Sequence, residues 1–524
     1  MVPFLNATPE KSTRFEKLWP LLAALVAAGA SAPALWLPFL SDDWAQIQAV
    51  ARSCPLTTPF HDFRPLFMAS LWLDRHLWGL APAWFHATNV LLIAACAALV
   101  VIVIRRFTRD PMMAIWAGVL FALHPFHVEN AAWVAARSDP LFALPFLLAL
   151  LAYDRWRKRA NAVPILALFL FELALLAKET AVTLPLVVVL IGALDINRRP
   201  QRREWIRGYG ALFAVAAVHF VFLRTWALGG LGRTLASSFG VAWIKNGLGF
   251  ALAAIIPLDA EILVAHPISS AAIGALVFAL LVLIVWFRAR RLPRLAVAGG
   301  LVFAALLLPY LVSFQERYIF LPVAAASLSL AAAVRATRGT VAVVLSVLLG
   351  AGWIGGCAAQ WADWREAAGA SRTLVDDLVR ESATEGLQEI VIANMPYAVR
   401  GGSVAGDLGA AIALSGGRPV RVRAAAYVSY PSATADALEG APTMMRVGET
   451  VYAELRLRIP GGSFSRFVGP RPPAGAIETV SSGCTLVLTP GGSLTVRVPE
   501  DLDAGRAVYV WNRGRLSPLF HSRG

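Results

Sequence analysis

The stretch LWPLLAALVAAGASAPALWLPFL, residues 18–40, decides the fold, and Ser41-Asp42-Asp43-Trp44 follows it directly. The stretch has no charged side chain and is long enough to cross the ~30 Å hydrocarbon core of a bilayer as a helix. We expect a retained first membrane helix rather than a cleaved signal peptide, because acidic residues follow and no small-residue cleavage site does. Asp42 and Asp43 then lie at the membrane boundary, where ionisable groups are costly in lipid and commonly mark a site.

Composition extends this interpretation to most of the chain. The protein has 524 residues, of which 58% are hydrophobic and 15% charged, whereas a typical soluble protein has about 25% charged residues. Apolar blocks recur along the chain, and a segment in lipid must satisfy its own backbone hydrogen bonds, which favours helices. The sequence therefore predicts an all-α polytopic membrane domain.

The net charge of +14 would also suit a nucleic-acid-binding protein. However, the arginines and lysines gather between apolar blocks, at 11–17, 105–109, 155–159, 198–207, 288–294 and 335–338. This is the pattern of short cytoplasmic loops in membrane proteins, and no basic stripe with interleaved aromatic residues is present. We expect a multi-pass protein, of a bacterial inner membrane, with a cytoplasmic N-terminus and no nucleic-acid partner.

Threading these blocks through the membrane gives about eleven helices. They are expected near residues 18–40, 85–104, 111–123, 140–153, 163–177, 182–194, 209–223, 271–287, 295–312, 319–334 and 341–358. Residues 243–258 are interpreted as re-entrant or interfacial, because a full crossing there would place the basic cluster at 288–294 outside.

Four regions follow from this threading. Residues 1–17 form a cytoplasmic tail and residues 18–359 the transmembrane domain. Residues 360–383 have tryptophans among charged residues, a pattern typical of an amphipathic helix at the membrane surface. Residues 384–524 contain short β-branched runs punctuated by Gly, Pro and Ser, which predict a small strand-rich extracytoplasmic domain.

Hydropathy and loop charge alone place many reactive side chains on the outer face, although the threading made no use of them. They come from four separate connections: Asp42, Asp43, Arg64, His124, His127, Glu129, Arg137, Asp139, Lys178, Glu179, Glu316 and Arg317. This convergence is the main argument for a site.

The two aspartates could supply a general base, and Asp42 with His127 could alternatively hold a divalent cation. The ordinary alternative for the pair is a solvated helix end. His124 and His127, within a dense polar turn, could donate hydrogen bonds to a phosphate. Trp133 could stack on a sugar or simply anchor the membrane interface.

Three cations could neutralise a phosphate at the membrane edge. Arg64 precedes a rigid proline and suits bidentate phosphate contacts, and Lys178 and Arg317 each interrupt a pair of apolar helices. Glu316 could orient Arg317. The alternative for these cations is that their side chains extend to the interface from helix ends.

Cations beside carboxylates at a membrane edge suit a lipid-linked phosphate substrate. The chain has no phosphate-binding loop or dinucleotide fingerprint, and nucleotide sugars are not normally available outside the cytoplasm. A polyprenyl-phosphate sugar is therefore the expected donor. A carboxylate would deprotonate an extracytoplasmic acceptor hydroxyl, and the cations would stabilise the departing phosphate.

These residues carry a resemblance to a known family. Asp42-Asp43 after the first helix and Arg64-Pro65 in the next loop resemble the GT-C glycosyltransferases. His124-Pro-Phe-His-Val-Glu129, with Trp133, Arg137-Ser-Asp139, Lys178 and Glu316-Arg317-Tyr318, is similar to the motifs of the transmembrane-and-tetratricopeptide-repeat O-mannosyltransferases and their bacterial relatives.

The resemblance covers about residues 18–360. It implies an inverting, polyprenyl-phosphate-sugar-dependent hexosyltransferase with Asp43 or Asp42 as the base. The repeat domain of that family is replaced here by the strand-rich tail, which leaves the acceptor open between protein and glycan or lipid.

Two other functions fit the same pattern. A flippase of lipid-linked sugars would use the same cations but would usually need polar residues in mid-membrane. The apolar blocks have few of these, with Glu172, His219 and Asn246 the main exceptions. A non-catalytic membrane scaffold with a partner-binding tail is the other alternative.

Overall fold

The computed structural model divides the chain into two units that interleave in sequence. The helical unit comprises Met1–Trp36 and Ser53–Gln360, and the strand unit comprises Leu37–Arg52 and Trp361–Gly524. The structure describes residues 15–158, 163–194, 202–229, 241–256, 293–337, 339–400, 402–404, 406–430, 432–433, 443–447, 450–457, 477–479, 485–488, 494–499 and 505–521. The segment that carries Asp42 and Asp43 thus belongs with the C-terminal part of the chain.

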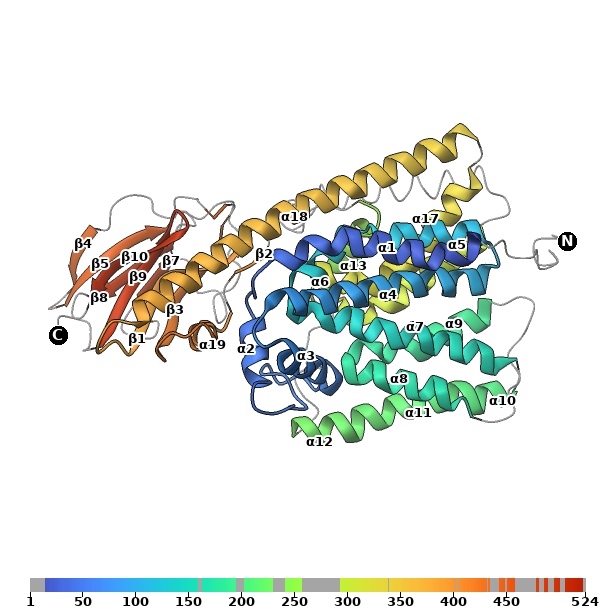
Figure 1. Ribbon diagram of the computed structural model, residues 1–524, viewed down its shortest axis with the longest axis horizontal. Helices are drawn as coiled ribbons and strands as arrows, with labels where there is room; N and C mark the ends of the chain where they lie inside the picture. Colours follow the sequence, from blue (N-terminus) through green and yellow to red (C-terminus); the bar gives the residue numbers. More distant parts are fainter. Residues whose placement is uncertain are drawn as a thin grey trace. The chain divides into compact units, whose positions relative to one another are not determined.

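The helical unit is built from apolar helices joined by short helical turns (Figure 1). Its N-terminal half contains η2 (Phe15–Leu18), α1 (Trp19–Ser31), η3 (Ala32–Trp36), α3 (Pro65–Trp78), α4 (Pro82–Thr108), α5 (Pro111–Ala122), α6 (His127–Ala132), η4 (Val134–Arg137) and α7 (Ser138–Arg157). It continues with α8 (Ile165–Ala177), η5 (Glu179–Thr183), α9 (Leu184–Leu194), α10 (Arg202–Glu204), η6 (Trp205–Tyr209), α11 (Gly210–Val218), η7 (His219–Arg224) and α12 (Thr225–Leu228). The last part contains α13 (Val241–Ala253), α16 (Pro293–Leu307), η9 (Leu308–Tyr310), η10 (Glu316–Ile319), α17 (Phe320–Ala336) and the first part of α18 (Thr340–Ser382).

Six helical segments within the described residues are long and apolar enough to cross a membrane. They are Glu16–Trp36, Pro82–Thr108, Val134–Arg157, Arg202–Leu228, Glu316–Arg335 and Thr340–Ser382. Shorter apolar helices cover Pro111–Ala122, Ile165–Ala177, Glu179–Leu194 and Leu295–Tyr310. The predicted fold class, a polytopic helical domain followed by a small strand-rich domain, is confirmed, and the chain is a multi-pass membrane protein.

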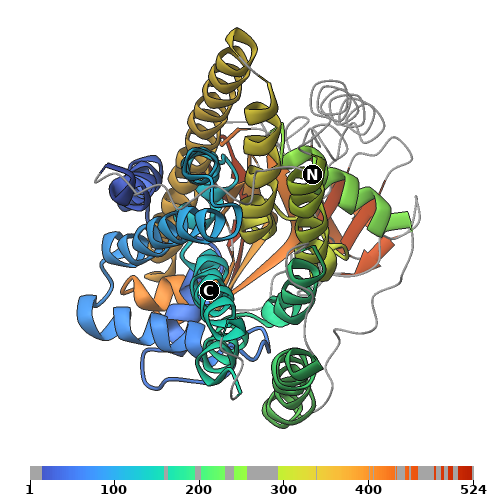
Figure 2. The ribbon, with the colours of Figure 1, turned by 90° about the vertical axis from the view of Figure 1, so that its right-hand side faces the viewer.

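Within the helical unit the long helices run side by side. Helix α4 packs against α1, α5 and α7; α7 packs against α8; and α17 packs against α5 and α16. Figure 2 views many of these helices nearly end-on. This packing brings the loops at one end of α4, α5, α7 and α8 within reach of one another, which matters for the site.

Parts of the long connection at 41–83, expected as a loop, are helical. Pro65 begins α3, because its fixed φ and missing N–H suit the first turn of a helix. Another expected connection, after residue 123, contains α6 and η4. Of the predicted re-entrant segment 243–258, residues 243–253 are helical within α13 and residues 254–256 form a turn. The helix predicted at 271–287 lies outside the described residues.

Helix α18 covers both the last predicted membrane helix and the predicted surface helix without a break. In the strand unit its face with Ala367, Ala370, Leu374 and Leu378 belongs to the hydrophobic core. The division between the two units falls inside this helix, after Gln360.

The strand unit contains two five-stranded sheets in its described residues. In the first, β1 (Glu389–Val399) lies parallel to both β3 (Arg421–Tyr430) and β9 (Arg506–Asn512), with Ile390 opposite Val422 and Val391 opposite Val508. The short β2 (Gly402–Ser403) and β10 (Arg515–His521) add antiparallel edges, and α19 (Leu408–Leu414) connects β2 to β3. The second sheet has the order β4-β5-β8-β7-β6, formed by Thr443–Val447, Thr450–Leu457, Leu494–Pro499, Thr485–Leu488 and Ile477–Thr479.

Candidate functional site

The helical unit gathers cations and carboxylates from four connections into three ion pairs, which we call the ion-pair cluster. Its members are Arg64 with Glu179, Lys178 with Asp139, and Arg317 with Glu129. The aromatic rings of Trp133, Tyr310 and Tyr318 lie against these cations.

Lys178 forms the most buried of the three pairs. Its Nζ lies 2.5 Å from Asp139 Oδ1, and the two side chains are 3% and 1% exposed. Helix α8 ends at the preceding residue, and the extended backbone of Lys178 itself (φ −159°, ψ 132°) carries the chain into η5. Burial lowers the pKa of Lys178 from its ordinary value, and Asp139 opposes that effect.

Arg64 holds Glu179 through two parallel hydrogen bonds. Its Nε and Nη2 donate to the two carboxylate oxygens at 3.0 and 2.8 Å. Burial alone would lower the pKa of Arg64, but the attraction of Glu179 more than offsets it, and the pKa lies above its ordinary value. A second cation, Arg224 of η7, lies 3.8 Å from the same carboxylate.

Arg317 is held by Glu129 at both its backbone and its side chain. Its backbone N–H and its Nη1 donate to the two carboxylate oxygens at 2.8 and 2.7 Å. The guanidinium lies 4.5 Å from the centre of the Trp133 ring, a distance typical of a cation–π contact. Glu129 is therefore a carboxylate that orients Arg317, whereas the sequence suggested Glu316, which lies beside it in η10.

Two tyrosines connect the pairs. The rings of Tyr310 and Tyr318 stack at 4.7 Å, and Lys178 Nζ lies 5.4 and 4.8 Å from their centres. Tyr318 also lies 5.2 Å from Arg317, and the Tyr310 hydroxyl donates to Thr180 Oγ1 at 2.9 Å. The cluster is thus one continuous polar and aromatic network.

Sequence reasoning did not single out Thr180, Tyr310 or Arg224. Arg224 could have been recognised from the sequence as a candidate site residue, because it is a lone cation at the end of an apolar run. Thr180 lies two residues after Lys178 in the sequence, whereas only the fold brings Tyr310 to Lys178.

The two histidines lie among aromatic side chains. His124 packs edge-on against Trp353 at 5.0 Å and its Nε2 lies 3.3 Å from the Ala253 carbonyl oxygen. His127 lies 4.5 Å from both the Phe121 and Phe320 rings. Burial lowers the pKa of His124 to about 3, and burial together with His124 holds the pKa of His127 well below its ordinary value. Both rings are neutral at physiological pH, so they can contribute hydrogen bonds but no positive charge.

Arg137 is completely enclosed by protein. Its Nε donates to Asn89 Oδ1 and its Nη2 to the Phe85 carbonyl, both at 2.7 Å, and it pairs with Asp74 at 2.6 Å. These partners tie α3 and α4 to η4. This arrangement gives Arg137 a structural role, and the sequence had singled it out as a supporting or acceptor-side residue.

Asp42 and Asp43 belong to the strand unit. Asp42 is half-buried and Asp43 is buried. The Asp43 carboxylate accepts a hydrogen bond from the Leu40 N–H at 2.9 Å, and the Asp43 N–H donates to the Leu40 carbonyl at 2.9 Å. The segment is thus a closed turn at the start of α2 (Asp43–Ala49).

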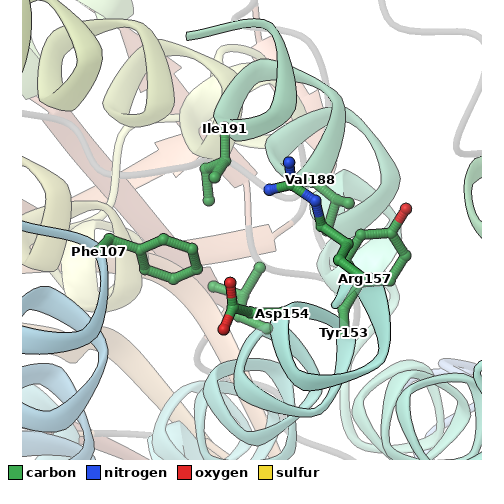
Figure 3. Close-up of a pocket in the computed structure, with 7 residues that line it drawn as sticks. Phe107, Tyr153, Asp154, Arg157, Val188 and Ile191 are labelled. Atoms are coloured by element: carbon green, nitrogen blue, oxygen red, sulfur yellow. The ribbon is translucent and has the colours of Figure 1, made fainter. Parts of the chain in front are cut away.

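Among the described residues, no group of three or more His, Cys, Asp and Glu side chains is arranged to hold a metal ion. A pocket elsewhere in the helical unit is lined by Phe107, Leu150, Tyr153, Asp154, Arg157, Val188 and Ile191 (Figure 3). It contains none of the predicted site residues.

Comparisons with known proteins agree with the motifs. The chain is 34% identical over 165 residues to mouse protein O-mannosyl-transferase TMTC1, an alignment covering 29% of this chain and 17% of that protein. It is 32% identical over 185 residues to the human TMTC1 protein, covering 33% and 20%, and 35% identical over 173 residues to Drosophila melanogaster Tmtc2, covering 31% and 18%. The chain thus spans about a fifth of the length of these relatives, and the predicted resemblance to this family is confirmed.

No family model matches the chain. Among solved structures, it is similar to the archaeal oligosaccharyltransferase AglB from Archaeoglobus fulgidus, in complex with an inhibitory peptide and a dolichol-phosphate. That likeness has a TM-score of 0.44 and 14% sequence identity, and it covers 80% of this chain and 65% of the other.

Proposed function

We propose that this protein is an integral-membrane glycosyltransferase. It moves a sugar from a polyprenyl-phosphate donor to an extracytoplasmic acceptor hydroxyl, with inversion at the anomeric carbon. The ion-pair cluster carries the proposal, because it concentrates Arg64, Lys178 and Arg317 beside apolar helices, where a lipid-linked phosphate would lie. The similarity to proteins named O-mannosyl-transferases supports mannose as the sugar and a protein hydroxyl as the acceptor.

The proposed reaction is a single displacement. A first-loop aspartate, Asp43 or Asp42, removes the proton of the acceptor hydroxyl, whose oxygen forms a bond to the anomeric carbon. The bond between that carbon and the phosphate oxygen breaks, and its electron pair leaves with the polyprenyl phosphate. The phosphate thereby gains a second negative charge, so fixed cations stabilise the transition state more than the ground state.

The ion pairs suit this task. Each cation is already positioned by a carboxylate, and little reorganisation is needed when the phosphate charge develops. Arg64 and Arg317 present planar guanidinium groups that can bind phosphate oxygens in pairs. Trp133, in contact with Arg317, offers an aromatic face for a sugar ring.

Transfer of radiolabelled mannose from polyprenyl-phosphate mannose, by purified protein in liposomes, tests the function. Removing a general base typically costs about 10²–10⁴-fold in rate, so either Asp42→Asn or Asp43→Asn should lose activity on that scale. The single variants identify the base. Full transfer by the double variant would exclude both aspartates.

A flippase for lipid-linked sugars is the second candidate, and one observation favours it. Inside the helical unit, His219 Nδ1 lies 2.9 Å from Glu172 Oε1, and both residues lie within apolar helices. Ionisable residues within membrane segments commonly serve transport pathways. Donor translocation across liposomes without any acceptor, lost in Glu172→Gln, would support transport; its absence alongside sugar transfer would support the enzyme.

A further inference from the structure

The segment that carries the two aspartates is built into the strand unit. Residues Leu37–Arg52 group with the C-terminal part of the chain, and α2 packs against α19. Trp44, directly after Asp43, packs against the core of the strand unit and meets Phe39 edge-on at 5.4 Å. The sequence offered no reason to connect these positions, which are more than three hundred residues apart.

The backbone of this segment is constrained at Ser41. Ser41 has φ 45°, a left-handed conformation that non-glycine residues rarely adopt. The reciprocal hydrogen bonds between Leu40 and Asp43 close the turn on either side of it. Such strained backbone persists only where surrounding structure holds it, and it concentrates at functional sites.

Gly406, two residues before the start of α19, lies in close contact with this turn. A Cβ atom at position 406 would lie 2.6 Å from the Ser41 carbonyl oxygen and 2.8 Å from the Asp42 nitrogen. Both are backbone atoms, so any side chain at this position would displace the turn rather than a flexible side-chain end. Only glycine allows the two backbones to approach this closely.

We propose that the strand unit positions the base segment for catalysis, with Gly406 and Trp44 as its two positioning residues. This inference rests on the proposed function and deepens it. The C-terminal domain then contributes to catalysis by holding Ser41–Asp43 in place. This contribution is independent of any role that the domain has in selecting the acceptor. Gly406 holds the backbone of the turn, and Trp44 anchors the start of α2.

Gly406→Ala tests the proposal, with Gly369→Ala as the matched control. Gly369 lies in α18 within the strand unit, and nothing lies within 4 Å of a Cβ placed there. A misplacement of about 1 Å can cost roughly 10²-fold in rate, so we expect G406A to lower kcat at least tenfold. The KM for the donor should stay within about twofold of the wild type, because the donor phosphate is bound by other residues. G369A should match the wild type in both.

A second pair of variants distinguishes a loss of positioning from misfolding. Trp44→Ala should lower kcat in the same way as G406A, and Trp44→Phe, which keeps an aromatic ring, should recover most of it. An unchanged kcat in both G406A and W44A, or a raised donor KM with unchanged kcat, would overturn the positioning role.

Hydrogen exchange at the backbone amides of residues 41–49 gives a measurement that does not depend on activity. Exchange should rise in G406A and not in G369A, and unchanged exchange in G406A would overturn the docking of the segment. If the wild type transferred no sugar while G406A raised the exchange, the proposed function would be wrong. The strand unit would then hold the segment without a role in catalysis. Raised exchange together with undiminished transfer in G406A would instead overturn the positioning role alone.

Discussion

At the scale of single residues, Lys178 and Asp139 form the most buried ion pair of the cluster. Removing one partner of a buried ion pair typically costs about 3–5 kcal/mol, because the other charge is left without compensation. We therefore expect Lys178→Met and Asp139→Asn each to destabilise the protein on that scale. Thermal unfolding in detergent measures the loss.

The double variant separates stability from function at this pair. Asp139→Asn combined with Lys178→Met removes both charges and should regain much of the stability, since replacing a whole buried pair is often neutral. Sugar transfer should remain lost, because the proposed donor site then lacks the Lys178 cation. Wild-type transfer by the double variant would remove Lys178 from the donor site.

The positions of the cations could be predicted from the sequence, whereas their carboxylate partners could not. Hydropathy and loop charge placed Arg64, Lys178 and Arg317 on one face, and the structure brings them into one cluster. The partners of these cations could not be assigned, because Glu129 and Arg317 are 188 residues apart and no local pattern connects them. The neutral state of His124 and His127 depends on burial among Trp353 and Phe320, which a motif alone does not reveal.

At the scale of elements, the connections that the threading predicts to lie outside contain α3, α6 and η4, and Arg137 links α3 and α4 to η4. Its carboxylate partner, Asp74 of α3, also accepts a hydrogen bond from Thr88 of α4 at 3.0 Å. The sequence singled out Arg137 as a supporting or acceptor-side residue because it stands in a polar motif. Pro65 could have predicted the start of α3, but the motif gave no sign that Arg137 points into protein.

Arg137→Gln should accordingly act on stability rather than on the donor. It leaves Asp74 buried without its cation, at a cost of about 3–5 kcal/mol, and adding Asp74→Asn should restore part of the loss. Arg317→Gln is the matched control: Arg317 is 19% exposed, so we expect a smaller loss of stability and a larger loss of transfer. Thermal midpoints and transfer rates measure both, and the reverse ranking would contradict the assignment.

At the scale of the whole molecule, the polytopic architecture followed from composition, whereas the grouping of the chain into units did not. Apolar periodicity is local, and it gave helices close to those observed for α4, α5, α8 and α9. The membership of Leu37–Arg52 in the strand unit depends on contacts with Gly406 and α19, which are long-range. The orientation of the helices in the membrane was inferred from the arginines and lysines of the loops. It is a prediction that can be tested directly.

Cysteine labelling provides that test, and the chain supplies one of the two probes. Cys54 is an exposed free cysteine in the first connection, which the threading predicts to lie outside, whereas Cys96 and Cys357 are buried. With Cys484→Ser as background, Cys54 should react with a membrane-impermeant maleimide on intact cells. Lys158, whose side chain is 59% exposed, lies in a predicted cytoplasmic cluster, so Lys158→Cys combined with Cys54→Ser should react only after permeabilisation. Reaction of both positions from the same side would overturn the threading, and with it the shared outer face on which the proposed donor site depends.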